Sequence, residues 1–166
     1  EGLRHRPTLG LVGAAVSDYE QIDSLLAGLD ELGARIAVSS LRVNHLPESL
    51  LTALAKSHTQ TLTLAPEAGC ERLRRLVSKG VTEAQILSAA ERADRHGFPQ
   101  LKLYFMIGLP GETEDDVLAI VELARAVKER FRRRITVHVT PFVPKPHTPF
   151  ERQPMQDSAV LDRAYR

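Results

Sequence analysis

Polar side chains follow several β-rich apolar runs of the chain, at the points where strands would end. Ser39 and Arg42 follow one run, Glu67 follows another, and Gly108 and Glu112 follow a third in "IGLPGE". In parallel β/α folds, ligands gather at the carboxyl ends of strands, because the loops there are free to vary. A carboxylate at a strand tip, as Glu67 would be, suits a vicinal diol. The backbone groups of "GLPGE" can read the edge of a flat heterocycle, although the same loop also suits a generic strand-to-helix turn.

Three residues near these tips have a structural alternative beside the functional one. Gly13 in "LVGAAVSDY" lets a ligand approach the backbone. Asp18 in the same stretch offers either a carboxylate ligand or a helix cap, and capping is the commoner use. Arg42 can also simply pair with a neighbouring carboxylate on the rim.

Elements that alternate between strand and helix must position these residues. Runs such as "LYFMI" and "LGLVG" are apolar on successive residues, which is typical of strands covered on both faces. The predicted strands are Thr8–Ala15, Arg35–Leu41, Thr61–Ala65, Leu101–Ile107 and Ile135–Phe142. Strand-to-strand intervals of roughly 25 to 40 residues fit βα units, so we expect parallel strands with right-handed crossovers.

Amphipathic patterns predict helices between these strands. Apolar residues at 22–32 recur at spacings of three and four, and Gly33 stands where a left-handed cap is expected. Thr82 with Gln85 forms a capping-box pattern at the start of another helix. The apolar stripe of the longest helix, which begins near Thr113, consists of Val117, Ile120, Val121, Ala124 and Val127.

The composition excludes several classes of protein. With 166 residues the chain can bury a core as one domain, but an eight-stranded β/α barrel needs more than about 200 residues. The net charge of +1 gives no case for nucleic-acid binding by the chain as a whole, and no run approaches the roughly 20 apolar residues of a membrane span. Cys70 is the only cysteine, which favours a reducing, cytoplasmic setting. Both ends, Glu1 and Arg166, look cut out of a longer protein.

Four motifs in order resemble those of a known family. "MIGLPGETEDD" after a strand resembles the adenine-side motif of radical S-adenosylmethionine (SAM) enzymes, and "PEAGCERLRRLVSKGVT" resembles their fourth-strand signature. "LVGAAVSDY" and "VTPFVPKPHTPF" fall at the expected second- and sixth-strand positions, so the matches cover roughly residues 8–150. "APEAG" and "PFVPKPHTPF" look closest to the uncharacterised cobalamin-domain radical SAM group. The general plan is also similar to that of tRNA methylthiotransferases.

The resemblance implies an α/β fold, namely a partial (β/α) TIM-like barrel of the radical SAM type with parallel strands. Residues 1–150 would form about strands 2 to 6 of the core barrel, and residues 151–166 a linker or the start of a following segment. The family's CxxxCxxC motif has no equivalent in this chain, and Cys70 alone cannot supply three thiolates to a cluster. Cys70 matches a small residue of the fourth-strand signature, with a lowered pKa at the helix start as the alternative. Tyr104 stands where many relatives have glycine.

The function that the resemblance implies belongs to a longer parent protein. Such an enzyme binds SAM at a [4Fe–4S] cluster, whose ligands we expect upstream of this chain, and cleaves it reductively to a 5′-deoxyadenosyl radical. The subgroup allows cobalamin as a further cofactor of the parent. The expected partners are SAM, the upstream domain of the same parent and a substrate that is RNA, protein or a small molecule, without a membrane.

The resemblance also assigns residues to SAM. Gly13 would approach the amino-acid group of SAM, whereas Ser39, Arg42 and Glu67 would serve its carboxylate or its ribose hydroxyls. Ile107 and Gly108 would contact adenine, and Glu112 would brace the following turn. No catalytic acid or base follows from the resemblance.

Histidines and arginines elsewhere raise further expectations. The six histidines do not have the spacing of a metal site. His138, within a strand, either faces the barrel interior or is a satisfied structural residue, whereas His147 and Lys145 lie in a loop at the expected substrate face. "RFRRR" at 130–134 could contact RNA phosphates, but arginines at a helix C-terminus also meet its dipole favourably, and we favour the structural alternative.

Two other functions also fit the sequence. A non-catalytic β/α binding or scaffold module would keep the fold without the cluster, and three cysteines at the family spacing upstream of Glu1 would exclude it. An ordinary β/α-barrel enzyme for a phosphorylated metabolite would need a phosphate loop near the late strands. The acidic residue in "GLPGE" suits phosphate poorly.

Overall fold

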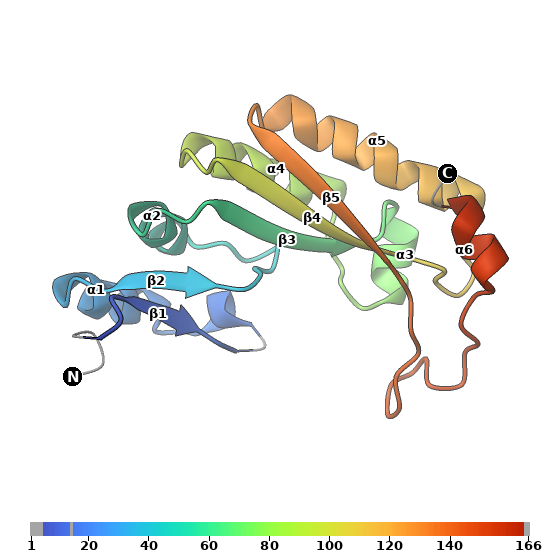
Figure 1. The fold of residues 1–166 in the computed structure, drawn as a ribbon, viewed down its shortest axis with the longest axis horizontal. Coiled ribbons are helices and arrows are strands. Elements are labelled where there is room, and N and C mark those ends of the chain that lie inside the picture. Colours follow the sequence, from blue (N-terminus) through green and yellow to red (C-terminus); the bar gives the residue numbers. More distant parts are fainter. Residues whose placement is uncertain (1–4, 14, 165–166) are drawn as a thin grey trace.

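Five strands alternate with helices along the chain (Figure 1). The computed structural model describes residues 5–13 and 15–164, so both chain ends and Ala14 lie outside the described residues. The strands are β1 (Thr8–Leu11), β2 (Arg35–Val38), β3 (Thr61–Glu67), β4 (Gln100–Ile107) and β5 (Arg134–Pro141). The helices are α1 (Ile22–Glu31), α2 (Glu48–Lys56), α3 (Glu71–Leu76), α4 (Glu83–Arg95), α5 (Glu114–Arg130) and α6 (Ser158–Ala164), with a 3₁₀ turn at Val16–Asp18. None of the helices in the described ranges is long and apolar enough to cross a membrane.

The strands form two parallel groups that a single bridge links. β1 pairs with β2, and β3, β4 and β5 pair in that order, all in parallel as predicted. Leu41, just beyond β2, bridges Leu64 of β3, and its N–H donates to the Thr63 carbonyl at 3.0 Å. The chain leaving β2 therefore runs beside β3.

The predicted strands are all present, with shifted ends. The first ends at Leu11, before the 3₁₀ turn, rather than at Ala15. The second ends at Val38, and the third continues past its predicted end at 65 as far as Glu67. β4 and β5 each begin one residue earlier than predicted.

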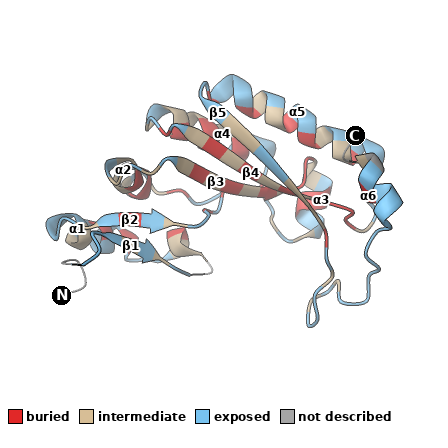
Figure 2. Cartoon of the chain, in the orientation of Figure 1, coloured by how far each residue is buried: buried red, intermediate tan, exposed pale blue. Residues whose placement is uncertain are grey.

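One face of the sheet is covered by helices and the other is open. The buried residues of β4 are Leu101, Leu103, Phe105 and Ile107, and they share one core with apolar residues of α4 and α5. The residues between them are half-buried (Figure 2), and because successive residues of a strand face opposite sides, they lie on the other side, which we call the open face. The prediction that "LYFMI" is covered on both faces is therefore wrong at Tyr104, which lies on the open face, whereas Met106 packs against a second hydrophobic cluster with Leu109 and Phe142.

Both predicted capping residues start helices. Thr82 and Gln85 form a complete capping box at α4, and Thr113 forms one with Asp116 at α5. Gly33 has a φ of +67° just after α1, as expected for a left-handed cap.

α5 buries much of the predicted stripe, but it buries Leu123 in place of Val121. Ile120, Leu123 and Val127 are buried, whereas Val121 is 47% exposed. Steps of three and four from Ile120 lead to Leu123 and Val127, and Val121 falls between these rows on the outer surface.

The tail of the chain folds back onto the core. Residues 158–164 form α6, and Leu161 is 7% exposed within the main core cluster. This part of the predicted linker is therefore packed, while the domain boundary at 150 stays a prediction.

Gly69 lets the turn after β3 touch the backbone of α5. A Cβ at this position would overlap backbone atoms of Ala119 and Ile120. Only glycine permits such a close approach, so the tip of β3 and the middle of α5 are in direct contact.

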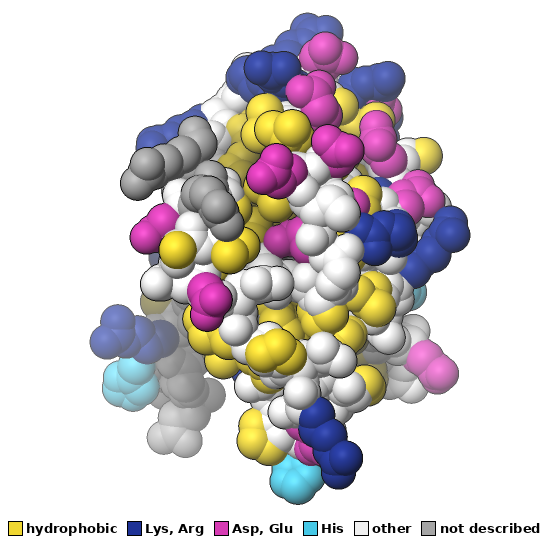
Figure 3. All heavy atoms as spheres, turned by 90° about the vertical axis from the view of Figure 1, so that its right-hand side faces the viewer, with side chains coloured by type: hydrophobic (Ala, Val, Ile, Leu, Met, Phe, Trp, Pro, Cys, Tyr) yellow, Lys and Arg dark blue, Asp and Glu magenta, His cyan; other side chains and the backbone are white. Residues whose placement is uncertain are grey.

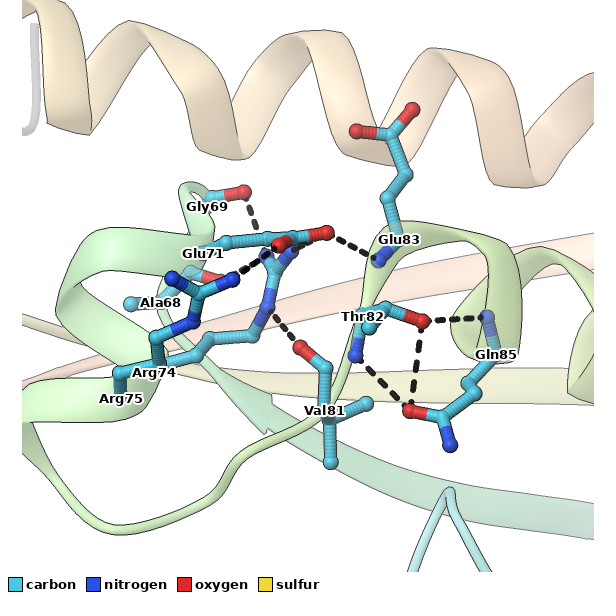
Figure 4. Close-up of polar contacts among 9 residues, drawn as sticks. All are labelled: Ala68, Gly69, Glu71, Arg74, Arg75, Val81, Thr82, Glu83 and Gln85. Atoms are coloured by element: carbon cyan, nitrogen blue, oxygen red, sulfur yellow. Dashed lines mark hydrogen bonds and ion pairs between the residues drawn. The ribbon is translucent and has the colours of Figure 1, made fainter.

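Arg74 in α3 is fully buried (Figure 4). Its Nε donates to the Val81 carbonyl at 2.7 Å, and Nη1 donates to the carbonyls of Ala68 and Gly69 at 3.0 and 2.6 Å. Within the described part of the chain, Nη2 is the one buried side-chain polar atom without a hydrogen bond, and it lies 4.0 Å from the Glu71 carboxylate. Burial lowers the pKa of this guanidinium, which nevertheless stays charged. The guanidinium thus joins the turn after β3 to the loop before α4.

Replacing Arg74 with Met should lower the free energy of unfolding by about 3 kcal/mol, because three buried carbonyls lose their donor. Arg75→Met is the matched control, since Arg75 is exposed and bonds only to Glu71. We expect the control to stay within about 0.5 kcal/mol of the wild type in urea denaturation followed by circular dichroism. Equal losses in the two variants would contradict the role of the buried guanidinium.

Candidate functional site

Glu67 ends β3 in a backbone conformation that is uncommon for a residue with a side chain. Its φ is +72°, and the pairing of β3 with β4 shifts register between Leu64 and Glu67. Such a conformation costs about 1 kcal/mol or more and persists only where the surroundings impose it. The carboxylate forms an ion pair of 3.0 Å with Lys79 in the loop between α3 and α4. Because the side chain keeps 21% exposure, the carboxylate stays accessible to a ligand.

The "GLPGE" segment is a tight turn closed by its own glutamate. Gly108 has a φ of +82°, and its N–H donates to a carboxylate oxygen of Glu112 at 2.5 Å. The turn therefore has the brace that the sequence led us to expect. Burial raises the pKa of Glu112, and the hydrogen bond from Gly108 partly offsets this rise.

Some backbone groups that could read an adenine edge are already bonded. The Ile107 carbonyl accepts from the Phe142 N–H at 2.8 Å, and the Gly108 N–H is used within the turn. Side chains of Gln156 and Leu161 cover Gly108, so that a Cβ there would approach each of them to 3.1 Å. An adenine contact at this turn therefore has to use its other backbone groups or its flat surface.

A cavity of about 390 Å³ opens between the start of α5 and α6. Its lining includes Glu112, Thr113, Val117, Leu118, Val160 and Leu161. On this end of the molecule, acidic side chains border a hydrophobic area (Figure 3). Glu112 therefore faces a hollow with partly apolar walls, an environment that favours the neutral form of a carboxyl group.

Asp116 connects the starts of α3 and α5. Its carboxylate accepts from the Cys70 thiol at 2.8 Å and from the Thr113 N–H at 2.9 Å. It also forms an ion pair with Arg72. Burial alone would raise the pKa of Asp116, but the hydrogen bonds from Cys70 and Thr113 hold it at about 2. Sequence reasoning missed Asp116 and Arg72, although the capping box in "TEDD" was a readable signal for the carboxylate.

Cys70 is a structural thiol in this arrangement. It is the N-cap residue of α3, as expected for a small residue at a helix start. Burial raises the pKa of the thiol, and the hydrogen bond to Asp116 raises it further, so the alternative of a lowered pKa is wrong. Across residues 5–13 and 15–164, no group of three or more His, Cys, Asp or Glu side chains is placed to hold a metal ion.

The residues after β1 and β2 have partners of their own. Arg42 pairs with Asp18 at 2.5 Å, which confirms the alternative of a carboxylate partner on the rim. Asp18 therefore bonds to Arg42, and it does not cap α1. Ser39 and Gly13 are exposed. Arg42 and Glu67 thus have different ionic partners, and the structure does not join them in one cluster.

His138 and His147, the two histidines discussed above, lie in different settings. His138 lies on the open face, with its ring centroid 4.9 Å from that of Tyr104. His147 is exposed, has a φ of +61° and donates its backbone N–H to Glu151 at 3.0 Å. Lys145 is exposed in the same loop. His138 is exposed in this structure, so both alternatives for it stay open, and substrate contacts of the loop residues stay predictions.

The arginines at 130–134 bond to helix α4. Arg130 pairs with Glu91, and Arg133 pairs with Asp94 at 2.9 Å. These contacts support the structural alternative for the "RFRRR" run.

Replacing Asp116 with Asn should destabilise the fold by about 2 kcal/mol near neutral pH, because the ion pair with Arg72 is lost and the donors of Cys70 and Thr113 lose a charged acceptor. The folded pKa of about 2 lies below the ordinary aspartate value, so this contribution is present above about pH 4 and is lost as the pH falls toward 2. Urea denaturation at several pH values should therefore show the two proteins converging in acid. Asp115→Asn, at the neighbouring exposed position, is the control, and a constant gap down to pH 2 would contradict the prediction.

Comparison of sequences finds relatives from archaea and bacteria. The chain is 41% identical over 143 residues to an uncharacterised protein of Methanocaldococcus jannaschii, covering 86% of this chain and 31% of that protein. It is 29% identical over 145 residues to the tRNA-2-methylthio-N(6)-dimethylallyladenosine synthase of Paracoccus denitrificans, covering 82% of this chain and 30% of that enzyme. An uncharacterised methyltransferase of Pyrococcus horikoshii is 30% identical over 87 residues, which are 52% of this chain and 19% of that protein. The chain thus spans about a third or less of the length of these relatives.

Comparison of folds also finds proteins that resemble this chain. Coproporphyrinogen III oxidase (HemN) from Escherichia coli, a radical SAM enzyme, has a TM-score of 0.64 at 16% identity, covering 98% of this chain and 43% of that one. SuiB from Streptococcus suis has a TM-score of 0.62 at 17% identity, covering 98% and 37%. These similarities confirm the partial β/α barrel with parallel strands. The model of the radical SAM superfamily matches residues 4–124, and the chain therefore belongs to that superfamily.

Proposed function

We propose that this chain is the SAM-binding part of a radical SAM enzyme whose full-length form cleaves SAM reductively to a 5′-deoxyadenosyl radical. The observation that carries the proposal is the superfamily match over residues 4–124, on a sheet whose tips present Glu67 and the "GLPGE" turn. Because the chain spans only 31% of its M. jannaschii relative, the activity is assigned to the parent protein.

The residues of this chain do not fit a [4Fe–4S] cluster. Such a cluster takes three thiolates from the family motif, and Cys70 is the only cysteine. Its thiol is protonated near neutral pH and donates to Asp116. We therefore assign the cluster ligands to an upstream segment of the parent, where the cluster would supply the electron for SAM cleavage.

The carboxylate of Glu67 fits the ribose of SAM. A carboxylate can accept hydrogen bonds from both hydroxyls of a vicinal diol, and the strained backbone of Glu67 holds it at the tip of β3. Lys79 orients the carboxylate before a ligand arrives. The turn at Ile107 and Gly108 would form the wall for adenine, and Glu112 keeps that turn closed.

The amino-acid group of SAM is assigned to the first two strand ends. Gly13 and Ser39 are exposed and therefore open to a ligand. Arg42 would have to exchange the Asp18 carboxylate for that of SAM, or share its guanidinium between them.

The subgroup remains part of the proposal. The "APEAG" and "PFVPKPHTPF" segments support a place in the cobalamin-domain group, in which cobalamin would be a further cofactor of the parent. The alternative is a non-catalytic β/α module that has lost the cluster, and the absence of three upstream cysteines at the family spacing would favour it. A cytoplasmic setting also stays a prediction.

The isolated chain should not assemble a [4Fe–4S] cluster after anaerobic treatment with iron and sulfide, because one thiol cannot replace three. Absorption and electron paramagnetic resonance spectra test this directly. A [4Fe–4S] signature from the chain alone would overturn the structural role of Cys70.

The reconstituted parent should release 5′-deoxyadenosine from SAM when it is given a reductant, measured by chromatography. Glu67→Gln should weaken SAM binding about tenfold, because an ionised acceptor for the ribose is lost. Lys79→Met removes the ion pair but keeps the carboxylate, and it should have the smaller effect. If both variants lose the same amount of SAM affinity, Glu67 acts only through its ion pair with Lys79, which is then a structural contact. A parent that does not cleave SAM would refute the proposal.

A further inference from the structure

The open face of β3, β4 and β5 carries rows of polar residues. The rows differ in how many hydrogen-bond partners their side chains have. The row nearest the amino ends of the strands is bonded within itself. Thr61 Oγ1 donates to Gln100 Oε1 at 3.4 Å, and Gln100 Nε2 donates to Thr136 Oγ1 at 2.6 Å. This row needs no ligand.

The next rows are built from Lys102, Tyr104 and His138. Lys102 and Tyr104 are two residues apart on β4 and so share the open face, and His138 of β5 is the direct register partner of Tyr104. The Lys102 ammonium lies 4.7 Å from the centroid of the Tyr104 ring, which meets the His138 ring edge-on at 4.9 Å. Three side chains with N–H or O–H donors therefore stand together.

These donors have no acceptor in the described part of the chain. Three other lysines have polar partners, since Lys56 pairs with Asp30, Lys79 pairs with Glu67, and Lys128 donates to two backbone carbonyls. Lys102 contacts only an aromatic ring, and no hydrogen bond joins the Tyr104 hydroxyl or the His138 imidazole to another described residue. The one acidic residue of the five described strands is Glu67, which Lys79 already engages.

The charge of this face is therefore positive and uncompensated. A half-buried ammonium without a counter-ion is unfavourable, and a bound anion would remove that cost. Lysine serves as a compact cationic donor to oxyanions, and the tyrosine hydroxyl can add a bond to the same group.

The geometry points to an anion-binding site at Lys102, Tyr104 and His138, which takes a phosphate or carboxylate group of the substrate. The site rests on the proposed function, in which the open face lines the barrel interior, and it gives that function a substrate class. Tyr104 precedes Gly108 by four residues, or about 13 Å along the strand. The site is therefore separate from the adenine turn, although it adjoins the end of β3, where Glu67 is the register partner of Phe105.

Titration of the chain with small probes, followed by two-dimensional NMR of backbone amides and of the His138 ring, tests the site. Phenyl phosphate and benzoate carry the two anions on one ring, and benzylamine carries a cation on the same ring. We expect shifts on β4 and β5 with at least one anion and none there with benzylamine. The anion that binds more tightly identifies the group, phosphate or carboxylate, that the site prefers.

Substitutions distinguish anion binding at this site from a general attraction between anions and the positive charges of the chain. Lys102→Met should weaken anion binding at least about tenfold, and Tyr104→Phe should weaken it severalfold without removing the ring. Lys56→Met, on the far helix α2, is the control and should leave binding unchanged. Thermal denaturation checks that each variant is folded, and Tyr104→Phe serves if Lys102→Met is not.

Equal binding of benzylamine, equal losses in Lys102→Met and Lys56→Met, or no shift with either anion would overturn the site. Neither SAM nor a cluster takes part in this experiment. Its failure would therefore leave the SAM-cleavage test of the parent unaffected, and a parent without SAM cleavage would not change the measured anion binding.

Discussion

The buried guanidinium of Arg74 is the interaction on which the carboxyl ends of the strands depend. It holds the carbonyls of Ala68 and Gly69, directly after β3, and that of Val81, directly before α4. Irregular backbone can be buried only if its polar groups are satisfied, and here one side chain satisfies three of them. The strained conformation of Glu67 immediately before this turn is possible because the turn itself is fixed.

Two carboxyl groups near the start of α5 have opposite environments. Glu112 faces a partly apolar hollow, and burial raises its pKa. Asp116, four residues later, accepts from Cys70 and Thr113 and has a pKa of about 2. Asp116 therefore stays ionised as a permanent link between helices, while Glu112 is the group whose charge can respond to its surroundings. The short motif thus separates a structural carboxylate from the turn to which we assign the adenine contact.

Local patterns in the sequence were enough to predict the elements and several helix starts. The capping box at Thr82 and the left-handed Gly33 depend on residues a few positions apart, so they can be read directly. The prediction that "LYFMI" is buried on both faces failed because an apolar run does not show which side of the sheet lacks a covering layer. Tyr104 and its neighbour Lys102 were the signal for an open face. The stripe of α5 was misassigned only in part, at Val121, since several apolar rows compete on a long helix.

The site was less predictable than the fold, because its contacts join distant segments. Nothing in "ERLRR" distinguishes the buried Arg74 from the exposed Arg75, and nothing near Glu67 names Lys79 as its partner. The family resemblance placed candidate ligands at strand ends, but it could not show that Arg42 is engaged by Asp18.

Gly69 has a mechanical consequence. With no side chain between its own backbone and that of Ala119 and Ile120, the turn after β3 cannot slide past α5. A tilt of α5, which begins two residues after the brace Glu112, would therefore also move the neighbouring end of β3. In the function proposed above, the contacts to the ribose and to adenine would then be coupled through the absence of a side chain at Gly69.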